Sequence, residues 1–120
     1  MTTRPTHPEL VQALAKPGLE ILHSMSAKDA HLMHMAMGIA GEAGEIIDAV
    51  KKAVIYRKEL DRENLIEELG DVQFFCEGIA QSIGVTLEEC REKNIDKLLV
   101  RYGTTYSDKA AQERKDKVGE

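Results

Sequence analysis

The sequence from residue 32 to residue 54, LMHMAMGIAGEAGEIIDAVKKAV, predicts one long amphipathic helix. Its apolar residues recur at steps of three and four, which places them on one face of a helix. They are Leu32, Met35, Ile39, Ala43, Ile46, Val50 and Val54. Ser26 followed by Asp29 resembles a capping box, with Asp in place of Glu. We therefore expect a helix that opens at Ser26, runs to about Val54 and buries one face.

Three more helices are predicted on either side of it. A first, short helix runs from about Pro8 towards Met25 and is interrupted near Pro17. The charged segment 56–60 forms a turn, and Asp61 is the N-cap of the next helix, which Gly84 ends. Its apolar stripe is Leu65, Leu69, Val72, Cys76, Ile79 and Ile83.

The last predicted helix begins at a capping box. Thr86 and Glu89 have the T-x-x-E spacing, and the helix runs to about Tyr102 before Gly103. No strand pattern occurs, aromatic residues make up 4% of the chain, and tryptophan is absent. This composition favours helix packing over a β-sandwich. We predict an all-α, four-helix-bundle-like fold, with one domain at 1–107 and a polar tail at 108–120 that is frayed or disordered.

One acidic motif occurs twice. Residues 39–46 read IAGEAGEI and residues 65–72 read LIEELGDV, so both contain the pattern aliphatic-x-x-Glu-x-Gly-acid-aliphatic. Acids three residues apart lie about 60° apart around a helix. Four carboxylates from two helices can therefore converge, namely Glu42, Glu45, Glu68 and Asp71.

The position of these acids indicates a metal site. Glu42 and Glu68 border the apolar stripes, where an uncompensated charge is costly. A cation among the carboxylates removes that cost, and hard ions such as Mg²⁺ or Mn²⁺ prefer oxygen ligands. A single pair of this kind is typical of solvated surface, so the duplication carries the prediction. Gly44 and Gly70 lie one residue before the second acid of each copy, which suggests that an ion, a ligand or a close helix needs room there.

A group of basic and amide side chains lies on the last predicted helix. Asn94, Lys97 and Arg101 share one face. They are explained either as cations favoured near a helix C-terminus or as ligands of phosphate, with Arg in bidentate contact. Acids for a metal together with bases for phosphate indicate phosphoryl transfer. Lys52 lies past the first acidic motif and either reaches the same ligand or is solvated, and His31 lies three turns from Glu42, too far to be a ligand.

Composition excludes several other classes. A net charge of −5 argues against a nucleic-acid polymer as partner.

Cys76 and Cys90 lack CxxC spacing and predict reduced thiols in the cytoplasm. Residues 1–10 lack the apolar run of a signal or membrane segment. The sequence also lacks a P-loop, GxGxxG, HExxH, a nucleophile elbow and the Glu-x-x-His pairs of a di-iron centre. We expect no membrane partner.

Three stretches in order resemble the MazG-like nucleoside triphosphate pyrophosphohydrolases, an all-α group that includes dimeric dUTPases, dCTPases and phosphoribosyl-ATP pyrophosphohydrolase. They are GEAGEIIDAVKK from Gly41, EELGDV from Glu67 and NIDKLLVRY from Asn94. The family pattern is ExxE, a spacer and ExxD, and 22 residues separate Glu45 from Glu68. The resemblance covers most of residues 26–106.

The resemblance implies an enzyme that uses Mg²⁺, with Mn²⁺ as a substitute, to hydrolyse a nucleoside or deoxynucleoside triphosphate to the monophosphate and pyrophosphate. Glu42, Glu45, Glu68 and Asp71 would be metal ligands and catalytic residues. The nucleotide contacts would be Asn94, Lys97 and Arg101, with Lys52 and Tyr102 as further candidates. The resemblance also implies a homo-oligomer, a tetramer or alternatively a dimer.

One position departs from the family pattern. Many members have Glu-Glu-x-x-Glu, whereas Gly41 stands where the first Glu would be. The number of metal ions and the identity of a general base are therefore left open. Two alternatives remain: a base-specific dCTP or dUTP pyrophosphatase, and a metal- or nucleotide-binding helical bundle without catalysis.

Overall fold

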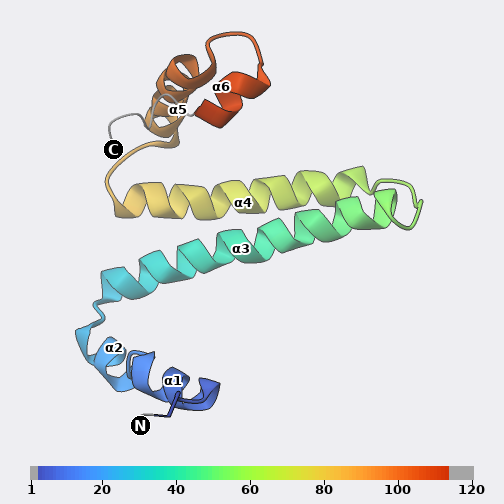
Figure 1. The fold of residues 1–120 in the computed structure, drawn as a ribbon. Coiled ribbons are helices and arrows are strands. Elements are labelled where there is room, and N and C mark those ends of the chain that lie inside the picture. The colour runs from blue at the N-terminus through green and yellow to red at the C-terminus, as the bar shows by residue number, and fades with distance from the viewer. Residues whose placement is uncertain (1–2, 114–120) are drawn as a thin grey trace. The chain divides into compact units, whose positions relative to one another are not determined.

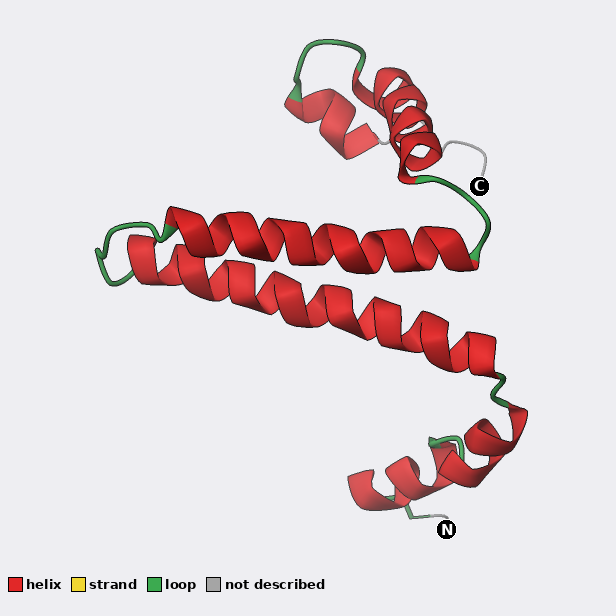
Figure 2. Ribbon diagram, turned by 180° about the vertical axis from the view of Figure 1, so that it is seen from behind, coloured by secondary structure: helices red, strands yellow, loops and turns green. Residues whose placement is uncertain are grey.

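Every secondary-structure element within residues 3–113, the part of the chain that the computed structural model describes, is a helix (Figures 1 and 2). This confirms the all-α class. The helices are α1 (His7–Leu14), α2 (Gly18–Ser24), α3 (Ala27–Val54), α4 (Arg62–Ser82), α5 (Leu87–Tyr102) and α6 (Asp108–Glu113).

Contacts divide the chain into two units, Met1–His31 and Leu32–Glu120. In the first unit, the predicted first helix is two helices separated at Pro17, which lacks an N–H and stands as the N-cap of α2. Thr6 caps α1 in a full capping box: its Oγ1 accepts from the Glu9 N–H at 3.3 Å, and its own N–H donates to Glu9 Oε1 at 3.0 Å.

The start of α3 agrees with the sequence. The Asp29 N–H donates to Ser26 Oγ at 3.0 Å, and the Ser26 N–H donates to Asp29 Oδ2 at 2.9 Å. Asp29 therefore takes the role that Glu has in the usual capping box, because its carboxylate accepts from the N–H of the N-cap residue. The helix then continues without interruption to Val54, as predicted.

Helices α3 and α4 of the second unit run antiparallel and lie side by side in both ribbon views. The loop between them includes Arg57, whose φ of 56° is in the left-handed region. Asp61 Oδ1 accepts from the Asn64 N–H at 3.1 Å, so Asp61 is the predicted N-cap of α4. Gly84, with a φ of 75°, follows the end of that helix.

Among the described residues of this unit, the buried apolar side chains are Met35, Ala49 and Ala80, which are 6%, 8% and 2% exposed. Much of the predicted apolar stripe of α3 is less covered, since Val50 is 40% and Val54 64% exposed. The reason is geometric, because one antiparallel neighbour covers only one side of a helix.

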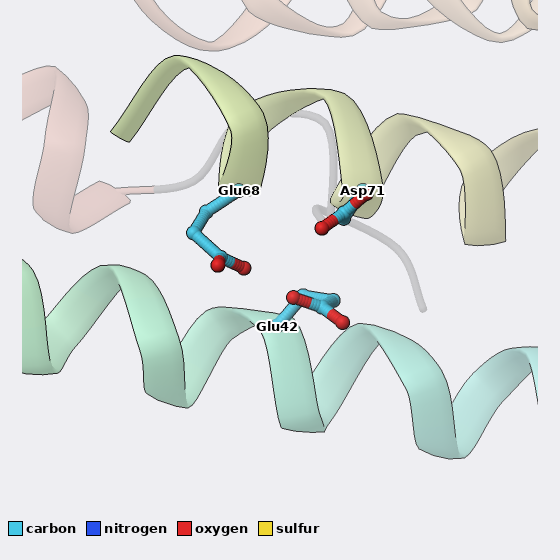
Figure 3. A group of neighbouring side chains, drawn as sticks. All are labelled: Glu42, Glu68 and Asp71. Atoms are coloured by element: carbon cyan, nitrogen blue, oxygen red, sulfur yellow. The ribbon is translucent and has the colours of Figure 1, made fainter. Parts of the chain in front are cut away.

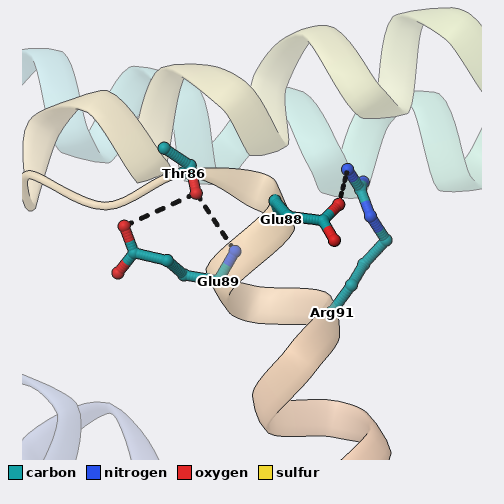
Figure 4. Close-up of polar contacts among 4 residues, drawn as sticks. All are labelled: Thr86, Glu88, Glu89 and Arg91. Carbon is teal, nitrogen blue, oxygen red and sulfur yellow. Dashed lines mark hydrogen bonds and ion pairs between the residues drawn. The ribbon is translucent and has the colours of Figure 1, made fainter.

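Helix α5 begins at the predicted cap. Figure 4 shows Thr86 Oγ1 accepting from the Glu89 N–H at 3.1 Å, with Glu88 and Arg91 paired at 3.2 Å on the first turn. Gly103, with a φ of 66°, ends the helix after Tyr102. Helix α6 packs on α5, so part of the predicted tail is helical; the tail from residue 114 lies outside the described residues.

None of the helices in residues 3–113 combines the length and the apolar character that crossing a membrane requires.

Candidate metal centre

The contacts of α3 with α4 define a regular seam. Met35 lies against Gly78 and Gly38 lies against Phe75, so that moving three residues along α3 corresponds to moving three residues back along α4. The same register can be continued along both helices in alternating steps of four and three residues, as in a coiled coil. It then pairs Glu42 with Asp71, Glu45 with Glu68 and Ala49 with Asn64. The repeated acidic motif therefore occupies the middle of a helix seam.

Side chains from both helices meet there. Glu42 from α3 and Glu68 and Asp71 from α4 each offer a carboxylate oxygen, and these oxygens lie within 4.8 Å of one another. Figure 3 shows Glu68 and Asp71 directed from α4 towards Glu42. Glu42 and Glu68 are half-buried, while Asp71 is exposed. The group is therefore partly open to solvent at Asp71.

Crowding of these acids changes the protonation of Glu68. The pKa of Glu68 is raised from 4.5 to about 7, most of all by a shared hydrogen bond with Glu42, and then by desolvation and by the negative charges of Glu42, Asp71 and Glu45. Two carboxylates can share a hydrogen bond only when one carries a proton. Without a cation, a proton on Glu68 therefore relieves the repulsion among these carboxylates at pH values below about 7.

The chemistry of the donors fits a hard divalent cation. All three side chains offer carboxylate oxygens, which Mg²⁺ and Mn²⁺ prefer. Glu68 Oε2 is buried and has no hydrogen-bond partner among the described residues. A buried acceptor without a donor is costly, and a cation would remove this cost. The residues present can therefore hold such an ion.

The fourth predicted ligand is set apart from the group. Glu45 is exposed and offers no oxygen within the cluster of three, although its charge contributes to the raised pKa of Glu68. It lies one turn along α3 from Glu42, on the same seam.

Glycines beside the acids adjoin open space. A Cβ added at Gly41, Gly44 or Gly70 would meet no atom within 4 Å. The close helix considered for Gly44 and Gly70 is therefore not found among the described residues, and room for an ion or ligand remains.

Lys52 lies at the other end of the seam. Its Nζ is 2.8 Å from Asp48 Oδ2, and this hydrogen-bonded pair raises the pKa of Lys52 and lowers that of Asp48. Both line a cleft of about 240 Å³ near the α3–α4 loop, together with Ala49, Lys58, Glu59, Asp61 and Asn64. Lys52 is thus engaged with Asp48 rather than with the acidic cluster.

The remaining predicted substrate residues lie on α5, which contributes no oxygen to the cluster. Asn94 and Lys97 are exposed, whereas Arg101 and Tyr102 are half-buried. The Arg101 guanidinium carbon lies 5.7 Å from the centroid of the Tyr102 ring, and its Nη1 is 3.4 Å from the Tyr102 hydroxyl. Tyr102 also lines a cavity of about 450 Å³ with Leu98, Gly103, Thr104, Thr105, Tyr106 and Ala111.

His31 is exposed and lies outside the group formed by Glu42, Glu68 and Asp71. His34 packs edge-on against Phe75, with 6.3 Å between ring centroids. Sequence reasoning did not single out Gly38, Gly78 or Phe75. The available signal was a glycine at a seam position of each long helix, opposite a large apolar residue.

Fold and site together describe an all-α protein with a carboxylate cluster suited to a divalent cation. The profile of the MazG nucleotide pyrophosphohydrolase domain matches residues 30–105. The chain therefore belongs to the MazG nucleotide pyrophosphohydrolase family, as the sequence motifs indicated.

A protein of Mycobacterium phage L5, the Gene 37 protein, is similar to this chain. The two are 36% identical over 75 residues, which cover 58% of this chain and 65% of the phage protein. The chain thus spans just under two thirds of that relative. No solved structure matches the chain.

Proposed function

We propose that this protein is a Mg²⁺-dependent nucleotide pyrophosphohydrolase that cleaves a nucleoside or deoxynucleoside triphosphate to the monophosphate and pyrophosphate. The observation that carries the proposal is the meeting of Glu42, Glu68 and Asp71 across α3 and α4, in a domain of the MazG family. Mn²⁺ is expected to substitute for Mg²⁺, since both are hard ions that accept carboxylate ligands.

Glu42, Glu68 and Asp71, with Glu45 beside them, would hold the cation. When bound, the cation polarises phosphate oxygens and lowers the pKa of a coordinated water. The hydrolysis forms a bond from the water oxygen to the α-phosphorus and breaks the bond from that phosphorus to the oxygen of the leaving pyrophosphate. One of the carboxylates orients the water or accepts its proton.

Side chains on α5 are the proposed nucleotide contacts. Arg101 and Lys97 offer positive charge for phosphate oxygens, and the Asn94 amide offers both a donor and an acceptor. The Tyr102 ring beside Arg101 limits the guanidinium to fewer orientations, which favours bidentate contact. Lys52 would join them only by leaving Asp48.

We propose further that the protein acts as a homo-oligomer, a tetramer or alternatively a dimer. Large apolar side chains with about two thirds of their surface exposed support this, among them Ile47 at 65%, Ile55 at 63% and Phe74 at 65%. Ile46, Ile47, Val50, Lys51, Val54 and Ile55 line a largely apolar surface hollow of about 400 Å³. Association of copies would bury this surface.

The cytoplasm is the proposed location. Cys76 and Cys90 are both free thiols, which suits a reducing compartment. The acidic net charge of −5 gives no attraction to a nucleic-acid polymer, so the proposed partner is the free nucleotide.

The test is product analysis. The purified protein is incubated with each ribo- and deoxyribonucleoside triphosphate, with Mg²⁺ and with EDTA, and the products are separated by anion-exchange chromatography. The proposal expects monophosphate and pyrophosphate that disappear in EDTA. Turnover restricted to dCTP or dUTP would favour the base-specific alternative, and no hydrolysis of any nucleotide would favour the non-catalytic binding bundle that Gly41 keeps open.

A matched pair of variants ties any activity to the site. Glu67 and Glu68 are adjacent on α4, but Glu67 is exposed and outside the cluster. Glu68→Gln should lose turnover, whereas Glu67→Gln should keep it. Equal activity of the two variants would contradict the assignment of the site.

A further inference from the structure

We propose that Gly38 and Gly78 are positioning residues, which set the register of α3 against α4 and so bring Glu42 opposite Asp71. This inference rests on the proposed function, because it treats these acids as ligands of the cation. It concerns residues outside both acidic motifs, at the end of the seam beyond Glu42 and Asp71.

The first contact joins Gly38 of α3 to Phe75 of α4. A Cβ added at Gly38 would overlap three ring atoms of Phe75, so the ring occupies the space that the missing side chain leaves. Phe75 is half-buried and is held on two sides, by His34 and by Phe74, whose ring centroid is 5.2 Å away at an interplanar angle of 90°. Moving the Phe75 ring aside would therefore break two edge-on ring contacts.

The second contact is the reciprocal of the first. Met35 of α3 lies against Gly78 of α4, where an added Cβ would overlap its Sδ and crowd its Cγ. Met35 is 6% exposed. Each helix therefore inserts one side chain into a gap on the other, and sliding either helix by one residue would lose both contacts.

These contacts adjoin the metal centre directly. Glu42 lies one turn after Gly38 on α3, and Asp71 lies one turn before Phe75 on α4. Glycine within a helix costs about 1 kcal/mol relative to alanine. At Gly38 and Gly78 this cost is offset by close packing, whereas Gly41, Gly44 and Gly70 have no neighbour within 4 Å of an added Cβ. Of these five glycines, Gly38 and Gly78 are thus the two that a side chain of the other helix approaches closely.

The experiment measures Mn²⁺ binding by electron paramagnetic resonance of the free ion, without any nucleotide. Gly38→Ala should bind Mn²⁺ about 10- to 100-fold more weakly, the scale seen when groups that support metal ligands are changed. Gly18→Ala, in α2 and away from the acidic motifs, is the control, because an added Cβ there also meets no atom within 4 Å, and it should bind Mn²⁺ as the unmodified protein does. Gly78→Ala should show a smaller loss, since the Met35 side chain is flexible.

A compensating variant separates positioning from general loss of stability. Gly38→Ala combined with Phe75→Leu shortens the group that the new methyl meets, and should recover most of the Mn²⁺ affinity. Phe75→Leu alone is the control, and circular dichroism checks that each variant keeps its helices.

Two results would overturn the inference in distinguishable ways. If the unmodified protein binds Mn²⁺ and Gly38→Ala binds it equally well, the positioning role is wrong while the proposed function stands. If the unmodified protein binds no Mn²⁺, the proposed function is wrong and the positioning role falls with it.

Discussion

Glu68 of α4 and Glu42 of α3 offer carboxylate oxygens within 4.8 Å of each other, and sharing a proton with Glu42 raises the pKa of Glu68. The same proton would have to leave before a divalent cation could take both groups as ligands. Protonation, helix contact and metal binding are therefore linked at this one place in the fold.

The free energy of unfolding of the metal-free protein should fall as the pH rises from about 4.5 to about 7. Folding raises the pKa of Glu68 from 4.5 to about 7, so in this window the folded state binds more protons than the unfolded state. Urea unfolding in EDTA at a series of pH values measures the slope. Glu68→Gln should flatten it, and a slope in Glu68→Gln as steep as in Glu67→Gln would contradict the assignment.

Binding of Mg²⁺ should release a proton at pH values below about 7. The cation requires ionised carboxylates, and the raised pKa keeps Glu68 protonated there in the metal-free protein. Isothermal titration calorimetry in two buffers of different ionisation enthalpy counts the protons released. An identical heat in both buffers would show that Glu68 is not part of the binding site.

Glu45→Gln should lower turnover by about a hundredfold, the upper end of the range for changes around a metal ligand. Glu45 faces Glu68 in the register of the seam, and its charge already acts on that carboxyl. The measurement is the steady-state rate with saturating Mg²⁺, with Glu67→Gln as the control. Unchanged turnover would leave Glu42, Glu68 and Asp71 as the complete set of ligands.

Arg101→Ala should raise the Michaelis constant roughly ten- to hundredfold, the scale of a lost hydrogen bond to a charged group. Arg91 provides the matched control, because it lies on the same helix but pairs with Glu88. Initial rates across a range of nucleotide concentrations give the constants for both variants. If Arg91→Ala and Arg101→Ala weaken binding equally, α5 acts through its overall charge and not through a contact of Arg101.

Thr86→Ala should reduce the free energy of unfolding by about 1 kcal/mol. The substitution removes the oxygen that accepts from the Glu89 N–H at 3.1 Å and so leaves the first turn of α5 uncapped. Thr86→Ser keeps the hydroxyl and should retain most of the stability. Urea denaturation measures the free energy of unfolding of both variants. An equal loss of stability in Thr86→Ala and Thr86→Ser would mean that the methyl group of Thr86 contributes more than its capping hydroxyl.

Several features of the fold were accessible from the sequence because they depend on neighbours within four residues. The caps at Ser26, Asp61 and Thr86 are of this kind, since side chain and backbone partner lie three residues apart. The long helix ending at Val54 followed from its periodicity. The split of the first helix and the addition of α6 were not foreseen in full, since short helices carry little periodic signal.

The candidate site was predicted in composition but not in arrangement. The repeated motif identified four acids, and three of them meet while Glu45 remains outside the group. The side-chain direction of an exposed Glu depends on rotamers and on a ligand, neither of which follows from spacing alone. The sequence left open whether Gly44 and Gly70 make room for an ion, a ligand or a close helix, and the close helix contacts occur at Gly38 and Gly78 instead.

Local sequence is thus sufficient for the long helices, their N-caps and the acids on α3 and α4, because backbone hydrogen bonds and helical periodicity act over a few residues. The tertiary structure alone shows that Phe75 fits against Gly38 and Met35 against Gly78, and that this register sets Glu42 opposite Asp71. The physical reason is that packing between helices depends on the shapes of side chains more than thirty residues apart, which no short-range pattern encodes.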